Sequence, residues 1–204
     1  DAQGATITPG FIACHNHAPG ETLQLAVLVG HPYEVEFVTI DSVVGKLKAK
    51  AQTLPPDTWV EGFFYDDTKV KDGRLVNVHD LDRVSADHPV RVEHRGGHTS
   101  FYNSKALAMA GVTKATPNPP GGTFDKGPDG ELNGRVTDRA NAALAKIGKR
   151  QTFSPDEQAR RGREGQAFIS SQFARYGLTS VHHEGGDPAQ APQPTPTTSM
   201  LLSS

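Results

Sequence analysis

The sequence is poor in cysteine, in basic excess and in long apolar runs, and each shortage excludes a class of protein. Of 204 residues only Cys14 is a cysteine, which excludes an internal disulfide and any zinc site built on several cysteines. The chain carries 21 basic and 23 acidic side chains, so we expect no nucleic-acid partner. No apolar run approaches the roughly 18 residues of a membrane span, and no secretory leader opens the chain, so we expect no membrane association. The single cysteine makes a reducing, cytoplasmic location the default expectation.

Apolar residues, turn formers and histidines make up the informative part of the composition. Apolar residues account for 35% of the chain, enough for a core of modest size, while 21 Gly and 15 Pro predict many turns. Nine histidines are an unusual number, and histidine is the commonest metal ligand. The question is therefore whether any of these histidines lie at spacings that a metal site needs.

Helix signals are spread along the chain, and the strongest opens at Ser154. Ser154 is a favoured N-cap residue, Pro155 suits the first helical position, and Glu157 completes a capping box. This helix is expected to end before Gly177. Apolar periodicity with a cap or a closing Gly or Pro nearby predicts three more helices. These cover residues 42–52, 105–110 and 136–147.

Short apolar runs predict strands of the kind that a parallel barrel buries. The clearest is Phe11–Cys14, for which we expect a buried strand. Residues 59–65 are also strand-like, whereas 113–134 are rich in Gly, Pro and Asp and predict a long segment without regular structure. Three barrel-type strands are predicted, near residues 6–14, 89–94 and 178–184.

Two histidines follow the first of these strands directly. His15 and His17 are separated by one residue, and side chains at i and i+2 of a strand lie on one face, about 6.5 Å apart. Two imidazoles at that spacing can bind one metal ion, and the ends of barrel strands carry the catalytic groups of such folds. The alternative is a pair of chance loop histidines, because the spacing alone does not require a metal.

The residues around this pair resemble the opening motif of the amidohydrolase superfamily. Thr8–His17 reads TPGFIACHNH, which is similar to the family's PGFIDAHxH. Further segments, in the family's order and up to about residue 187, are similar to its YtcJ-like branch, which includes N-substituted formamide deformylases. These segments are Trp59–Gly62, Tyr65-Asp66, Leu81-Asp82, Pro89-Val90, Gly97-His98, Asn103–Leu107, Ala110–Val112, Pro119–Gly122, Gly130–Gly134 and Gly177–Val181.

The resemblance implies a metal-dependent (β/α)-barrel hydrolase with a small β-sandwich beside the barrel. A full barrel takes about 250 residues, and three strands do not close one. We therefore expect an α/β chain with a partial TIM-type barrel, from which the flanking sandwich and the later barrel strands are missing. Residues 1–187 are predicted to form this incomplete barrel segment. Residues 188–204 are predicted to be a disordered Pro/Gln/Thr-rich tail.

The activity that the resemblance implies is hydrolysis of a carbon–nitrogen bond other than a peptide bond, in a small amide or formamide, by metal-activated water. His15 and His17 are the implied ligands of a divalent metal ion, for which we predict zinc, although imidazole also suits iron and manganese. The family's later lysine, two histidines and aspartate cannot be placed in this sequence, so the catalytic groups are unassigned and the fragment is expected to be inactive alone or nearly so. The alternative is a non-catalytic metal-binding or interaction module derived from such an enzyme.

Other histidines and one asparagine are weaker candidates. The resemblance implies that His98 and Asn103 contact the substrate; the competing interpretations are a loop histidine bonded to backbone and a helix cap. His182 and His183 end the third predicted strand. They either take part in the site or have no functional role. Three further histidines are expected to be surface residues without a role in a site: His31, His79 and His88.

The opening motif departs from the family at two positions. Ala13 stands where the family usually has Asp, which removes a carboxylate that could orient the neighbouring ligands. Cys14 stands where a small residue is usual, and strand alternation favours a buried filler over a metal ligand. Asp138 replaces a Glu that often follows the Gly-rich loop, which is a smaller change.

Overall fold

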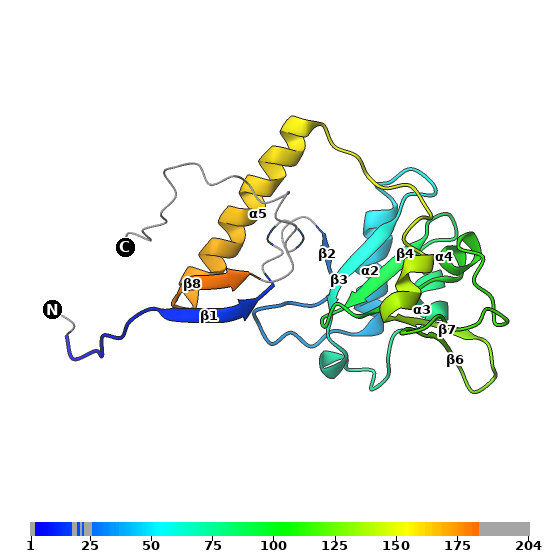
Figure 1. Ribbon diagram of the computed structural model, residues 1–204, viewed down its shortest axis with the longest axis horizontal. Helices are drawn as coiled ribbons and strands as arrows, with labels where there is room; N and C mark the ends of the chain where they lie inside the picture. Colours follow the sequence, from blue (N-terminus) through cyan, green and yellow to red (C-terminus); the bar gives the residue numbers. More distant parts are fainter. Residues whose placement is uncertain (1–2, 18–19, 21, 23–25, 184–204) are drawn as a thin grey trace. The chain divides into compact units, whose positions relative to one another are not determined.

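The computed structural model describes residues 3–17, 20, 22 and 26–183. The predicted tail over 188–204 lies outside these residues. The chain divides into two compact units, one drawn from residues 1–25 and 154–204 and the other comprising 26–153. Figure 1 shows the elements of each unit coloured along the sequence.

The described elements of the smaller unit include two strands and one long helix. Strand β1 (Phe11–Asn16) pairs in parallel with β8 (Leu178–His183). Helix α5 (Pro155–Arg175) lies between them in sequence and packs against β8 (Figure 1). Its N-cap is the predicted one, because the Ser154 hydroxyl accepts a hydrogen bond from the Glu157 N–H. The strong local signals of this helix are therefore sufficient to place it.

The prediction that β1 is buried is wrong for the described chain. Phe11 is 63% exposed and Ile12 is 68% exposed. The reason is that β1 pairs with β8 alone among the described strands. A two-stranded sheet with one packed helix cannot cover both faces of an apolar strand.

The larger unit is built on a mixed six-stranded sheet. Its strand order is β2-β3-β4-β5-β7-β6, with β2, β3 and β4 parallel and the remaining pairs antiparallel. The strands are β2 (Val27–Leu28), β3 (Val60–Tyr65), β4 (Val90–His94), β5 (Thr99–Tyr102), β6 (Phe124–Lys126) and β7 (Leu132–Thr137). The helices of this unit are α2 (Ile40–Ala51), α3 (Val78–Asp82) and α4 (Ser104–Met109), with the short 3-10 turns η1 (Asp67–Lys69) and η2 (Asp138–Ala143).

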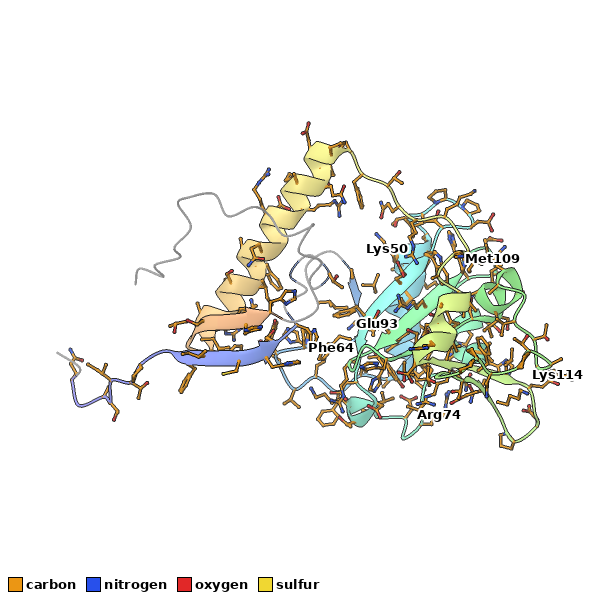
Figure 2. The ribbon with its side chains drawn as sticks, in the orientation of Figure 1. Lys50, Phe64, Arg74, Glu93, Met109 and Lys114 are labelled. Carbon is orange, nitrogen blue, oxygen red and sulfur yellow. The ribbon has the colours of Figure 1, made fainter. Side chains whose placement is uncertain are left out.

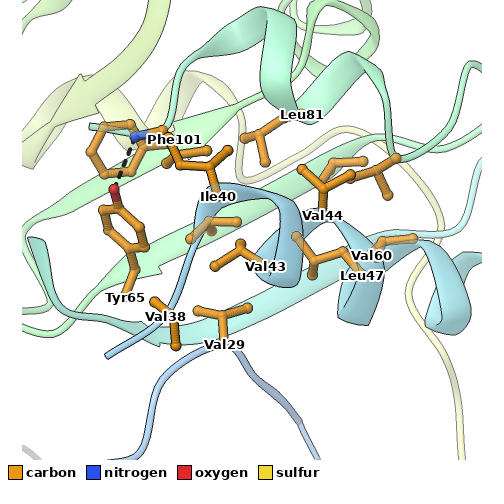
Figure 3. Close-up of a cluster of buried hydrophobic side chains, with 14 of the residues drawn as sticks. Val29, Val38, Ile40, Val43, Val44, Leu47, Val60, Tyr65, Leu81 and Phe101 are labelled. Carbon is orange, nitrogen blue, oxygen red and sulfur yellow. Dashed lines mark hydrogen bonds between the residues drawn. The ribbon is translucent and has the colours of Figure 1, made fainter. Parts of the chain in front are cut away.

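One hydrophobic cluster joins α2 to the parallel strands. The helix begins after Thr39, whose hydroxyl accepts a hydrogen bond from the Ser42 N–H, and its apolar stripe faces β3 and β4. Figure 3 shows Val43 and Leu47 packed toward this sheet. The Tyr65 hydroxyl lies inside the same cluster and accepts the Val76 N–H at 2.9 Å. Burial raises the pKa of Tyr65 to about 12, so it stays a neutral core residue.

A second cluster joins α4, β7 and η2 around the only tryptophan of the chain. Trp59 packs against the Tyr102 ring at 6.1 Å, and its indole N–H donates to the Ile147 carbonyl at 2.6 Å. The indole N–H is therefore satisfied although the side chain is buried, as a core tryptophan requires.

The segment between residues 113 and 147 differs from the prediction. The predicted loop contains β6 and the start of β7, and the predicted helix over 136–147 is the end of β7 followed by η2. Thr137 makes no capping hydrogen bond, and Asp138 has φ +43°. A regular α-helix cannot start from that left-handed residue, which explains the shorter 3-10 turn.

The fold is mixed α/β, as predicted. Within the described ranges neither sheet closes on itself. The partial barrel therefore stays a prediction. Among these same residues, no helix combines the length and the apolar character needed to cross a bilayer.

Candidate functional site

The first candidate site lies at the carboxyl ends of β1 and β8. Because the strands are parallel, both ends lie at one edge, where Asn16 is the register partner of His183. His15 and His17 flank Asn16, and both side chains are exposed. Their ring centroids are 5.3 Å apart with an interplanar angle of 80°. The two imidazoles that the sequence singles out thus lie close together at the end of a strand.

The separation of the two rings can be tested against the needs of a shared ion. A zinc–nitrogen bond of about 2.0–2.1 Å places the centroid of a ligating imidazole roughly 3.2 Å from the metal. Two centroids at that distance from one ion and 5.3 Å from each other subtend about 110° at the ion, which is near the tetrahedral angle. The spacing of His15 and His17 therefore fits a pair of zinc ligands.

The remaining ligands of such a site are not assembled in the described structure. Across residues 3–17, 20, 22 and 26–183, no three His, Cys, Asp or Glu side chains group as a metal site requires. Cys14 is exposed, so the prediction of a buried filler is wrong, for the same reason that Phe11 is exposed. His182 and His183 end β8 without completing a ligand set with the His15–His17 pair.

A second candidate site is a groove in the larger unit, beside His98. The imidazole is 83% exposed, and its Nδ1 lies 3.3 Å from Asp138 Oδ1. The Asp138 N–H also donates to the His98 carbonyl at 2.7 Å, so two contacts tie these residues together. Asn141 donates to the same carbonyl and accepts from the Tyr102 hydroxyl at 2.9 Å. His98 is thus held in place from the η2 side.

The groove has a volume of about 480 Å3 and a wall of mixed polar and apolar character. Arginine side chains at positions 91 and 139 line it together with His98, Asp138 and Asn141. Sequence reasoning missed both arginines. The sequence signal that could have indicated the groove is the two Gly-Gly dipeptides at 96–97 and 121–122, since Gly97 and Gly121 line it.

The comparisons with known proteins identify the family of the chain. The sequence profile of the amidohydrolase family matches residues 1–200. The chain belongs to the amidohydrolase family. The family resemblance read from TPGFIACHNH and the later segments is therefore confirmed.

Curated relatives of this amidohydrolase chain include one enzyme named for its substrate. The N-substituted formamide deformylase of Arthrobacter pascens is 29% identical over 145 residues, which cover 69% of this chain and 26% of that protein. The putative amidohydrolase YtcJ of Bacillus subtilis is 31% identical over 70% of this chain and 26% of its own length. Protein LONG AFTER FAR-RED 3 of Arabidopsis thaliana is 31% identical over 88% of this chain and 29% of its own length. The chain thus spans between a quarter and a third of the length of these relatives.

Solved structures give a weaker similarity. An uncharacterised metal-dependent hydrolase from Pyrococcus horikoshii aligns with 86% of this chain and 30% of its own, at 17% identity and a TM-score of 0.44. A second one, from Pyrococcus furiosus, aligns at 21% identity and a TM-score of 0.43. These scores are too low to support an argument about the fold.

Asn103 has a structural position in the amidohydrolase chain. It is completely buried, and its Oδ1 accepts the N–H groups of Ala106 and Val90, each at 3.0 Å. Its Nδ2 donates to the His88 carbonyl at 3.0 Å and to that of Ser85 at 3.4 Å. The helix-cap interpretation agrees with these contacts. A substrate contact would require breaking them, so we do not include Asn103 in the proposed site.

Two other histidines have roles that differ from the prediction or add to it. His88 is 5% exposed, and its Nδ1 lies 2.9 Å from the Thr58 carbonyl, so the surface assignment is wrong. His94 accepts the Gly96 N–H at Nδ1 and contacts Asp67 through Nε2 at 2.8 Å. That hydrogen bond holds the pKa of the Asp67 carboxyl below its usual range. Both nitrogens of His94 are therefore engaged, and the ring is unsuited to a metal.

Proposed function

We propose that this chain carries the first two metal ligands, His15 and His17, of an amidohydrolase that cleaves a non-peptide carbon–nitrogen bond in a small amide or formamide. Family membership supports a metal-dependent hydrolase. The name of the Arthrobacter relative supports the formamide-like substrate. The observation that carries the proposal is the 5.3 Å separation of the two rings at the end of a strand.

In this proposal the chain's own residues hold and orient the ion. His15 and His17 bind as neutral imidazoles, each through one ring nitrogen, and β1, which carries His15 and ends one residue before His17, is paired with β8. A bound zinc ion lowers the pKa of its water and polarises the carbonyl that is attacked. A catalytic zinc needs about three protein ligands, so at least one further ligand and the general base come from outside the pair.

Zinc titration by calorimetry tests the proposed pair. Replacing both histidines, His15→Ala with His17→Ala, is expected to weaken zinc binding more than about 100-fold, because loss of a partner that only orients a ligand already costs about 10–100-fold and here both ligands themselves are lost. His79→Ala is the matched control, since His79 is exposed and lies outside both candidate sites. The circular dichroism spectrum should not change, because both rings are exposed. Equal zinc affinity in the double variant and the control would discard the pair as ligands.

The second candidate function is a metal-binding or interaction module without turnover. It is favoured by the absence of a three-ligand group among the residues that the structure describes. Release of formate from a panel of N-substituted formamides by the zinc-loaded chain would support the enzyme. Zinc binding without any formate release would support the module.

A further inference from the structure

We propose that the groove beside His98 binds a small hydroxycarboxylate, with Arg139 holding the carboxylate and His98 forming a hydrogen bond with the hydroxyl. The groove is formed within residues 91–141 and does not involve the His15–His17 pair. The proposal therefore does not rest on the metal site, and a negative zinc titration would leave it standing.

Three turns with left-handed backbone build the groove. Gly97 has φ +74°, Gly121 has φ +78° and Asp138 has φ +43°. Aspartate is one of the few residues besides glycine that tolerates this conformation, but it is still uncommon there. Such backbone outliers gather at binding sites, where the surrounding structure holds them. Here the surrounding structure is the hydrogen bond between the Asp138 N–H and the His98 carbonyl.

Arg139 is the cation that the groove offers to a ligand. Its side chain lies against Gly121, where a Cβ would come within 3.3 Å of the arginine Cδ. Its guanidinium makes no ion pair or hydrogen bond with the residues that the structure describes. Arg91, the other arginine in the wall, is already offset by Glu93 at 2.6 Å and by Glu61 at 3.5 Å. Figure 2 shows Glu93 near the end of β4, on the strand that carries Arg91.

His98 and Asp138 decide which anion suits the groove. His98 Nδ1 lies 3.3 Å from Asp138 Oδ1. A neutral imidazole has one donor and one acceptor nitrogen, and a hydroxyl can complement either of them, whereas a second anion can only accept. The Asp138 carboxylate also opposes a doubly charged phosphate more than a singly charged carboxylate. A carboxylate facing Arg139 and a hydroxyl facing His98 satisfy both preferences. The 480 Å3 volume is within the range of small-molecule sites.

Titration of the full chain by 1H–15N NMR tests the proposal with three probes. 3-Hydroxybutyrate carries both groups, butyrate lacks the hydroxyl, and 3-hydroxybutyramide lacks the charge. We expect 3-hydroxybutyrate to shift the amides of Gly97, His98, Gly121 and Arg139 saturably, and each of the other probes to bind more weakly. Equal affinity for all three probes, or shifts confined to other residues, would overturn the proposal.

Two variants and one control assign the contacts. Arg139→Gln is expected to weaken 3-hydroxybutyrate binding about tenfold, the scale of a lost charge-assisted hydrogen bond. Arg163→Gln makes the same change of charge at an exposed arginine of α5 and should leave the affinity unaltered. His98→Phe is expected to abolish the preference for 3-hydroxybutyrate over butyrate. If Arg139→Gln and Arg163→Gln bind alike, Arg139 is not the carboxylate site and the proposal fails.

Discussion

The two units of the chain bury their apolar residues to very different extents. In the larger unit, two clusters enclose most of the fully buried side chains, including Leu47, Val92 and Phe101. In the smaller unit, α5 buries only Gly165 and Ile169, and no residue of β1 is fully buried. The candidate metal pair thus lies on the thinly packed unit, whereas the groove beside His98 lies on the well-packed one. Packing and candidate chemistry can therefore be tested separately.

The largest effect expected from this contrast concerns two phenylalanines. Phe101 is 1% exposed and packs edge-on against Tyr65 at 5.4 Å, whereas Phe11 is 63% exposed. Phe101→Ala is expected to lower the free energy of unfolding by about 3–5 kcal/mol, because it leaves a cavity in the core. Phe11→Ala should change it by less than about 0.5 kcal/mol. Urea denaturation followed by far-UV circular dichroism measures both, and equal losses would show that the contrast in burial has no energetic counterpart.

A smaller effect is expected from the helix caps of the two units. Asn103→Ala removes the cap of α4 and also leaves the buried Val90 N–H and His88 carbonyl without this partner. The expected cost in unfolding free energy is about 2–4 kcal/mol. Ser154→Ala removes only the exposed cap of α5, at an expected cost of about 1 kcal/mol. The same denaturation experiment compares them, and a larger loss for Ser154→Ala would reverse the assignment of the better-packed unit.

The smallest effect in this series depends on pH and separates a buried carboxylate from an exposed one. The Asp80 side chain is 7% exposed and accepts two hydrogen bonds from Arg74. Burial alone raises the pKa of Asp80, but the hydrogen bonds from Arg74 and the Asn77 N–H outweigh it, so the pKa lies below its ordinary value.

A carboxyl whose pKa is lowered by folding stabilises the protein above its unfolded-state pKa, and this contribution is lost as the pH falls through the folded-state pKa. Asp80→Asn is therefore expected to cost about 1–3 kcal/mol near pH 7, with the difference from the wild type shrinking below about pH 4. Asp41→Asn, which removes an exposed partner of Arg83, should cost less than about 1 kcal/mol. Thermal melts between pH 3 and 7 provide the comparison, and a pH-independent difference for Asp80→Asn would contradict the linkage.

Local signals in the sequence were enough for the elements that carry their own caps. The predicted helices beginning near Ser42, Ser104 and Ser154 are present as α2, α4 and α5, because each has a cap and a clear stop. β5, β6 and β7 were missed, since they are short and their pairing is decided by contacts far along the chain.

The sites were predictable to different degrees for the same reason. The closeness of His15 and His17 was predicted from their i, i+2 spacing at the end of a strand, although β1 ends at Asn16 and its pairing is irregular between Ala13 and Asn16. The groove could not be predicted from the sequence, because Arg139 and His98 are brought together only by the pairing of β5 with β7. The burial of His88 likewise depends on its contact with Thr58, thirty residues away.

The edge strands of the two sheets differ in length and in exposed apolar surface. The six-stranded sheet ends in β2 and β6, which are two and three residues long and so offer little backbone to another strand. β1 is six residues long, carries Phe11 and Ile12 exposed, and has one edge without a described neighbour. An apolar edge of that length is a template for strand addition. When this chain is handled at high concentration, self-association is therefore expected to begin at β1, and a lysine introduced there is the natural way to keep the protein monodisperse.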